Sequence, residues 1–360
     1  MSSHSHSPAH KSRIASRARI MKTNAVYFPS SQVYQGYTPA MLNYSCIDRV
    51  YYAYASIDEH GGVFLTDEWA DTQAPVDRVK GALGSLMHLK QEHRHLQVLL
   101  SIGGDSCSDV FALVAAHALL RDNFARSALG LVEACGLDGI DIAWEYPCNV
   151  EQGNHFVVLL DAVRLHLRHD QHILTASLPA STAVLQFIDI AATANYLDCI
   201  NLMAYDFFGP LSPRSGHHSQ LYAMSRDEPS ASSGVAYIMA RGFPPGGILL
   251  GIPTYGRSFL NATGPGQKFK GAGGDGGTFN YNELPRKNCK EAVDKRRISA
   301  HCVSGDGGFV TYDNPETVKA KAAFVKQKGL GGLFYWNGPA DSNEKSRSLI
   351  AAGFRSLHTS

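Results

Sequence analysis

The sequence lacks several features that would assign it to a specialised class of protein. Seven cysteines scattered over 360 residues are too few for a disulfide-stabilised scaffold. No Cys and His cluster has zinc spacing, so no metal or other cofactor is predicted. No apolar run reaches the roughly 18 residues of a membrane helix, and the net charge of +1 gives no reason to expect nucleic acid as a partner. The composition, 44% hydrophobic and 18% charged, is that of an ordinary globular protein with a large core and no membrane partner.

The first residues, 1–22, also lack the apolar segment of a secretory signal. They are rich in Ser, His and Arg and are expected to form a disordered arm. The chain as written is therefore expected to be cytoplasmic, and secretion would require a different native N-terminus. Cys289 and Cys302 flank a polar loop and could form a disulfide in an oxidising compartment.

Short apolar, β-branched runs recur along the chain, with helical material between them. Several of these runs are apolar throughout, as expected for strands that are covered on both faces. The predicted strands are 25–28, 50–57, 98–102, 139–145, 173–178, 199–205, 248–253 and 332–336. Helical periodicity is clearest over 124–135, 154–167, 315–327 and 344–357, the last with Ser342 or Asn343 as its N-cap.

Eight strands that alternate with helices predict an α/β fold, a (β/α)₈ TIM barrel. A doubly wound open sheet is the alternative, but no G-x-G-x-x-G follows the first strand. The interval 258–310 is rich in Gly, Lys and Asp and breaks the alternation, so it is predicted to be a small α+β insertion domain after strand seven. The barrel would then comprise 23–257 and 311–360, after the arm 1–22.

The fourth predicted strand carries an unusual row of side chains. Because strand side chains alternate, Asp141, Ala143 and Glu145 lie on one face and apolar residues on the other. Buried carboxylates persist when they are paired, hydrogen-bonded or functional. Glu145 at the strand end is the candidate general acid. Asp141 either tunes its neighbours or is a satisfied structural acid, and Asp138 is expected to bond the backbone where the strand begins.

Functional side chains of such barrels lie at the carboxyl ends of the strands. Here those positions hold acids, one base and many aromatic rings, a combination that suits sugars because sugar rings have apolar faces and polar edges. The residues are Tyr27, Tyr54, Glu145, Tyr146, Met203, Tyr205, Asp206, Tyr255, Arg257 and Trp336. Trp69, in the loop after the second strand, could stack on a sugar further out or pack on the surface.

Several motifs resemble those of family 18 glycoside hydrolases, the chitinases, in the same order. The run from Asp138 to Glu145 resembles the signature D-x-x-D-x-D-x-E, with Ala143 at the third Asp. The other matches are Ser101-Ile-Gly-Gly104, Met203-Ala-Tyr205-Asp206, Gly251-Ile-Pro-Thr-Tyr255-Gly-Arg257 and Gly331-Gly-Leu-Phe-Tyr-Trp336. Tyr281-Asn-Glu283 in the insertion resembles the deep-cleft subfamily.

The resemblance implies a retaining, substrate-assisted cleavage of β-1,4 links between N-acetylglucosamine units, an exception to the two-carboxylate scheme. Glu145 would protonate the leaving oxygen while the acetamido oxygen attacks the anomeric carbon. Tyr205 would hold that acetamido group, and Asp206 and Arg257 would hold the distorted sugar. Trp336 would form the floor under it, with Tyr27 and Tyr54 beside. The implied partner is chitin or its oligomers, bound by a monomer.

Ala143 departs from the family pattern, because a methyl group can neither accept the acetamido N–H nor stabilise positive charge. The catalytic cost is expected to be about 10²–10⁴-fold, with binding less affected. Either a chitinase has been altered at this one position, or the chain is a natural non-catalytic chitin-binding lectin. Retention of the other matched positions favours the first interpretation. An endo-β-N-acetylglucosaminidase acting on N-glycans is a further alternative.

Two milder departures lie on the leaving-group side of the cleft. Asp105 and Pro210-Leu211 stand where many relatives carry Trp, so stacking there is expected to be weaker. Asp105 could contact sugar hydroxyls, although a helix N-cap is the role expected for it.

Overall fold

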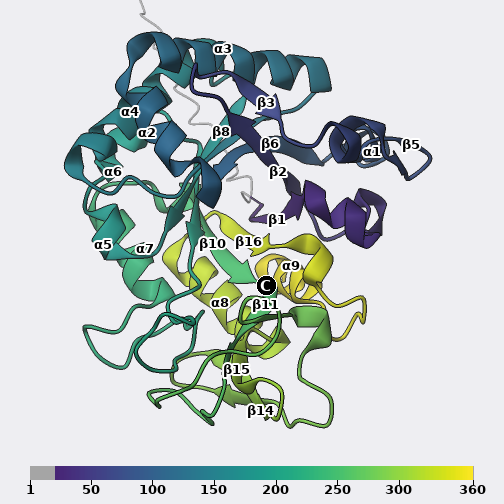
Figure 1. Ribbon diagram of the computed structural model, residues 1–360, viewed down its shortest axis with the longest axis vertical. Coiled ribbons are helices and arrows are strands. Elements are labelled where there is room, and N and C mark those ends of the chain that lie inside the picture. The colour runs from purple at the N-terminus through teal and green to yellow at the C-terminus, as the bar shows by residue number, and fades with distance from the viewer. Residues whose placement is uncertain (1–20, 360) are drawn as a thin grey trace, which may run out of the picture.

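Eight parallel strands form a closed barrel in the computed structural model, which describes residues 21–359 (Figure 1). Their order around the barrel is β1-β16-β10-β9-β8-β7-β6-β2, and β2 pairs with β1 to close it. The barrel strands are β1 (Thr23–Pro29), β2 (Arg49–Ile57), β6 (Gln97–Gly104), β7 (Gly139–Trp144), β8 (Ile173–Pro179), β9 (Cys199–Met203), β10 (Ile248–Pro253) and β16 (Gly332–Trp336). This confirms the predicted (β/α)₈ barrel and excludes the open sheet. The predicted arm lies mostly outside the described residues.

Helices cover the outside of the barrel (Figure 1). They are α1 (Ala82–Glu92), α2 (Ser108–Ala116), α3 (Ala118–Cys135), α4 (Val150–His166), α5 (Thr182–Leu185), α6 (Ile190–Thr193), α7 (Ala231–Ala240), α8 (Pro315–Lys328) and α9 (Leu349–His358). Within residues 21–359 none of the helices combines the length and apolarity needed to cross a membrane.

The prediction for the last helix was wrong at its N-terminus. Helix α9 begins at Leu349, not near residue 344, and its cap is Ser348, whose hydroxyl accepts from the Ala351 N–H at 3.0 Å. The Asp341 carboxylate fixes this start, since it accepts from the Ser348 hydroxyl at 2.6 Å and from the Leu349 N–H at 2.8 Å. The Asp341 carboxylate and the cap residue are seven positions apart, so the local helix-cap pattern could not show this arrangement.

A second, antiparallel sheet lies beside the barrel at the lower end of Figure 1. It contains, in order, β12 (Thr278–Asn280), β11 (Tyr255–Phe259), β15 (Gly308–Tyr312), β14 (Ser299–Ser304) and β13 (Ala292–Asp294). Strands β12 and β15 both pair with β11. Short β3 (Val63–Leu65) pairs with β2, and β4 (Pro75–Val76) with β5 (Val79–Lys80).

The two faces of β7 differ in polarity. Trp144 points outward, stacks on Phe111 of α2 with 5.5 Å between ring centroids, and meets Phe156 of α4 edge-on at 6.2 Å. The opposite face turns Asp141 and Ala143 into the barrel, where both are buried. Outward aromatic packing therefore anchors the strand and sets the direction of its inward, polar row.

Candidate active site

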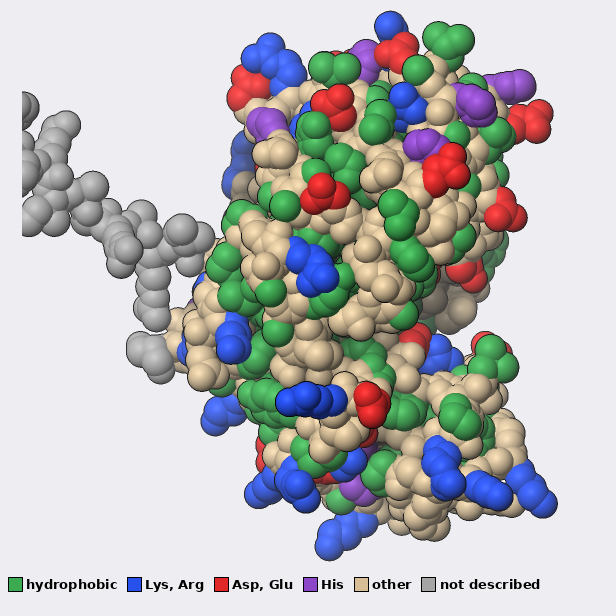
Figure 2. All heavy atoms as spheres, turned by 90° about the vertical axis from the view of Figure 1, so that its left-hand side faces the viewer, with side chains coloured by type: hydrophobic (Ala, Val, Ile, Leu, Met, Phe, Trp, Pro, Cys, Tyr) green, Lys and Arg blue, Asp and Glu red, His purple; other side chains and the backbone are tan. Residues whose placement is uncertain are grey.

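A hollow of about 530 Å³ opens at the carboxyl ends of the barrel strands. It brings together residues from six different strand ends and from the second sheet. The predicted site residues on its wall are Tyr54, Glu145, Tyr146, Met203, Tyr205, Asp206, Tyr255 and Trp336. Figure 2 shows the surface notched between the larger, upper part of the molecule and the smaller, lower part, where Figure 1 places β14 and β15. We call this hollow the cleft.

Glu145 follows the last residue of β7 and is half-buried at the wall of the cleft. Burial raises the pKa of its carboxyl from 4.5 to about 7, and the negative charges of Asp105, Asp141 and Asp206 add to the rise. The Ser108 hydroxyl at the start of α2 donates to the Glu145 main-chain carbonyl, which holds the backbone in place. A carboxyl in this environment retains its proton near neutral pH and can deliver it to a leaving group.

Asp141 lies beneath the cleft in a buried polar network. Its carboxylate accepts five hydrogen bonds from β1, β6, β8 and β9, namely from Tyr27 (2.8 Å), Ser101 (2.8 Å), Thr175 (2.6 Å), Ser177 (3.0 Å) and Asn201 (3.3 Å). Burial raises its pKa, and these hydrogen bonds oppose the rise. The network ties four strands to one carboxylate on β7, and the charge of that carboxylate acts on Glu145.

Ala143 stands between these two acids in the inward row and is 1% exposed. It lies opposite Gly103 of β6, and a Cβ on Gly103 would come within 2.3 Å of the Ala143 carbonyl oxygen. Gly103 has φ 123°, a conformation that favours glycine. The strands are therefore tightly packed at this level, and the Ala143 methyl group offers no hydrogen bond to the cleft.

Asp206 on the wall of the cleft forms a bidentate ion pair with Arg257, which does not itself line the cleft. The guanidinium Nε and Nη2 donate to the two carboxylate oxygens at 2.7 and 2.8 Å. Burial alone would raise the pKa of Asp206, but the pair and the buried His218, 3.4 Å from Oδ1, hold it well below its usual range. Asp206 has φ 58°, and the pair holds it in this strained conformation. Arg257 belongs to β11, so the pair joins the barrel to the second sheet.

Aromatic rings form the floor of the cleft and the layer beneath it. Trp336 stacks on Tyr54 with 5.7 Å between centroids and meets Tyr27 at 5.3 Å. Tyr205 meets Tyr255 edge-on at 6.2 Å. Tyr27 is 2% exposed, so it supports Trp336 and Asp141 from below and does not line the cleft.

The structure corrects the role expected for Asp105 and places Trp69 at the surface, one of the two positions expected for it. Asp105 is not the N-cap of α2, because that helix begins at Ser108 after Cys107; the Asp105 side chain lines the cleft. Trp69 does not line the cleft, and its ring stacks on Tyr34 at 5.2 Å with both rings largely exposed. Tyr34 was not among the predicted residues, since a tyrosine in the first loop has no distinguishing pattern.

The family model described as "Glycosyl hydrolases family 18" matches residues 23–341 of the chain. The chain belongs to glycosyl hydrolase family 18. Its relatives include Endochitinase 1 of Metarhizium robertsii, 34% identical over 93% of this chain and 85% of that protein. The sporulation-specific chitinase 2 of Saccharomyces cerevisiae is 30% identical over 93% of this chain and 78% of that protein.

Solved structures of family 18 share the fold. A chitinase of Cycas revoluta, solved in complex with (GlcNAc)3, has a TM-score of 0.81 and 25% identity and covers 92% of this chain and 98% of its own. The Ostrinia furnacalis Group IV chitinase has a TM-score of 0.86 over 94% of this chain and all of its own, with 23% identity.

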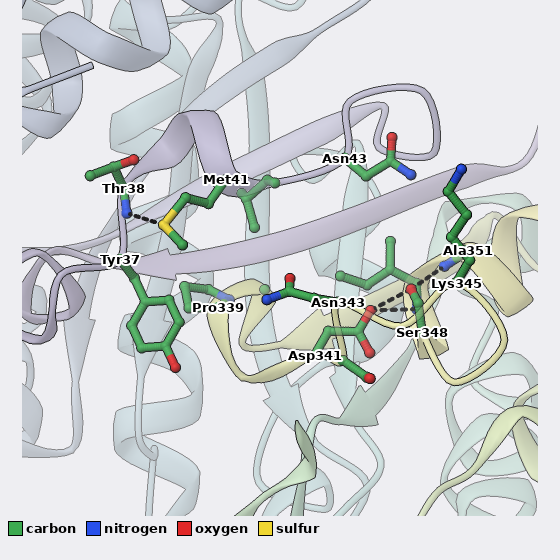
Figure 3. Close-up of a pocket in the computed structure, with 14 residues that line it drawn as sticks. Tyr37, Thr38, Met41, Asn43, Pro339, Asp341, Asn343, Lys345, Ser348 and Ala351 are labelled. Carbon is green, nitrogen blue, oxygen red and sulfur yellow. Dashed lines mark hydrogen bonds between the residues drawn. The ribbon is translucent and has the colours of Figure 1, made fainter. Parts of the chain in front are cut away.

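A second hollow, of about 230 Å³, lies away from the family 18 motifs (Figure 3). The connections from β1 to β2 and from β16 to α9 form it, with Tyr37, Met41, Pro339 and Lys345 on its wall. The Asp341 carboxylate on its wall already accepts hydrogen bonds from Ser348 and Leu349 at the start of α9. This hollow contains none of the predicted site residues. All seven cysteines, including Cys289 and Cys302, are free thiols in the structure.

Proposed function

We propose that the cleft is that of a chitinase, which hydrolyses β-1,4 links between N-acetylglucosamine units. The observation that carries the proposal is the position of Glu145, a carboxyl with pKa near 7 in a cleft floored by Trp336. A proton donor beside a flat aromatic ring suits a glycosidic oxygen held above a sugar face. The names of the relatives support the same substrate.

The proposed reaction is substrate-assisted and retaining. Glu145 protonates the leaving oxygen while the acetamido oxygen of the sugar attacks the anomeric carbon to give an oxazolinium ion. Glu145, now a carboxylate, then takes a proton from the water that opens this ring. Tyr205 binds the acetamido group, Asp206 and Arg257 bind the sugar, and Asp141 tunes Glu145 through its charge.

In this chain the step is impaired at Ala143. The proposed third carboxylate would orient the acetamido group and stabilise the positive charge, and its absence costs about 10²–10⁴-fold in rate. Glu145, Trp336 and the Asp206–Arg257 pair remain, so binding of N-acetylglucosamine oligomers persists. We propose that one chain provides the whole cleft and acts as a monomer. Its barrel segments are 23–257 and 311–360 and its insertion is 258–310, and the sheet of the insertion also includes the start of β11 and the end of β15 from the barrel segments.

Binding of a chito-oligosaccharide by the unaltered protein tests the proposal. Calorimetric titration with the N-acetylglucosamine tetramer is expected to show binding, and cellotetraose, which lacks acetamido groups, much weaker binding. Trp336→Ala should weaken binding of the tetramer by about tenfold or more, because it removes the aromatic ring at the floor of the cleft. Trp69→Ala, an exposed tryptophan outside the cleft, is the matched control and should change little. Absence of tetramer binding would overturn the proposal.

Substrate preference and turnover of the Ala143→Asp variant distinguish the two rival functions. An N-glycan endo-β-N-acetylglucosaminidase would require the Ala143→Asp variant to cleave N-glycans in preference to chitin oligomers. A lectin would show binding but no turnover in that variant. The motif that contains Tyr255 and Arg257, which lies on β11 of the second sheet, favours chitin.

A further inference from the structure

Asp105 has a carboxylate without a partner at the wall of the cleft. It follows Gly104, whose φ of 90° and ψ of −179° turn the chain out of β6 at the place where the Tyr54 ring closes off the space. The side chain is exposed, and within residues 21–359 it makes no hydrogen bond or ion pair. It is neither a helix cap nor part of the packed core.

Asp105 lies where it would contact a sugar bound in the cleft. It lines the cleft with Glu145, and it also lines an adjoining hollow of about 240 Å³ that shares Tyr54. After burial, its charge is the largest influence that raises the pKa of Glu145, ahead of Asp141 and Asp206. Asp105 and Glu145 line the same hollow, so a sugar unit next to the bond that Glu145 protonates would lie within reach of Asp105.

The charge of Asp105 is also unopposed. The carboxylate of Asp206 is neutralised by Arg257, and that of Asp141 accepts five hydrogen bonds. The described residues that line the two hollows include no Lys or Arg. An N-acetylated sugar is neutral and offers this carboxylate only hydroxyl and amide donors. A sugar with a free 2-amino group carries a positive charge and would form an ion pair.

We propose that Asp105 binds a protonated amino sugar, so that the cleft takes partially N-deacetylated chitin with a free amine on the unit beside Glu145. The inference rests on the proposed function, and it concerns the neighbour of the sugar whose acetamido group attacks. That attacking unit must stay acetylated, whereas its neighbour is free to carry an amine. The acceptable substrate is therefore mixed, with acetylated and deacetylated units in defined places.

The test measures binding to the unaltered protein in slightly acidic, low-salt buffer. The probes are the fully acetylated tetramer and tetramers of the same length with one free amine at each inner position. One amine isomer is expected to bind about three- to tenfold more tightly than the acetylated tetramer, as a partly exposed ion pair allows. High salt and Asp105→Asn should both remove this preference. Asp105→Glu should keep part of it, and Asp170→Asn, an exposed acid away from the cleft, should keep all of it.

Each result decides between the claims. If the acetylated tetramer does not bind, the proposed function itself fails. If that tetramer binds but no amine isomer binds better, only the amino-sugar inference fails. Equal loss of both ligands in Asp105→Asn would make Asp105 a general sugar contact and would also overturn the inference.

Discussion

At the scale of single residues, three neighbouring positions of β7 have different environments. Asp141 is enclosed by five donors, Ala143 is packed against β6, and Glu145 reaches the cleft. The alternation of a strand turns all three side chains to one face, but depth in the barrel decides what each can do. Only Glu145 combines access to substrate with a pKa near neutrality.

The raised pKa of Glu145 predicts the alkaline limit of activity. In the Ala143→Asp variant, kcat/KM on N-acetylglucosamine oligomers should fall as pH rises through about 7 or above, because the acid must be protonated and the added carboxylate at 143 further disfavours its ionisation. Asp105→Asn in that background should move this limb to lower pH, since removal of a negative charge makes the carboxyl easier to ionise. A limb near 4.5, the unperturbed value, or one that Asp105→Asn leaves in place would contradict the assignment.

The network around Asp141 predicts a large stability effect. Asp141→Asn replaces one acceptor oxygen by an NH₂ group that faces buried hydroxyl donors. The free energy of unfolding should fall by about 3 kcal/mol, as when a buried polar partner is lost. Guanidinium denaturation of the variant and the unaltered protein measures this change in the free energy of unfolding. Asp170→Asn, the same change in an exposed ion pair, should cost less than about 1 kcal/mol, and equal effects at both sites would contradict the role given to the network.

Much of the cleft could be predicted from side chains at strand ends, because barrel topology brings those ends together. What could not be predicted is how deeply each side chain is buried and which other side chain it contacts. Tyr27 ends beneath Trp336 because its hydroxyl bonds to Asp141, a contact between residues 114 positions apart. Asp105 looked like a cap because it precedes a helix, but a short turn at Asp105–Cys107 delays that helix to Ser108.

At the scale of elements, the barrel strands were predictable and the helix ends were less so. Continuous apolar runs identify strands covered on both faces, and all eight lie where expected. Helix α9 began later than predicted because its start depends on Asp341, a carboxylate from another turn. A local pattern cannot identify a cap that is reinforced from outside the helix.

The start of α9 gives a matched pair of substitutions. Ser348→Ala removes the cap and a donor to Asp341, so the free energy of unfolding should fall by about 1–2 kcal/mol. Asn343→Ala removes the cap suggested by sequence and should change stability by less than about 0.5 kcal/mol. Thermal or chemical denaturation of both variants measures the difference. A larger loss for Asn343→Ala would place the start of the helix where the sequence pattern put it.

At the scale of the whole molecule, the cleft depends on two structural units. The barrel supplies Glu145 and Trp336 to the wall of the cleft, and the second sheet supplies Tyr255 through β11. The ion pair between Asp206 and Arg257 crosses the boundary between the units. Lys and Arg side chains gather on the lower part in Figure 2, whereas the described walls of the cleft carry acids. The charge that matters for a ligand is therefore local to the cleft.

The central claim is that the chain holds a complete hydrolytic cleft except for one carboxylate at position 143. The most direct measurement is the rate of release of short oligomers from the N-acetylglucosamine tetramer by the unaltered chain, by Ala143→Asp, and by Ala143→Asp combined with Glu145→Gln. The account predicts that Ala143→Asp raises the rate by about 10²–10⁴-fold and that Glu145→Gln abolishes the gain. Equal rates for the unaltered chain and Ala143→Asp, or a gain that survives Glu145→Gln, would contradict it.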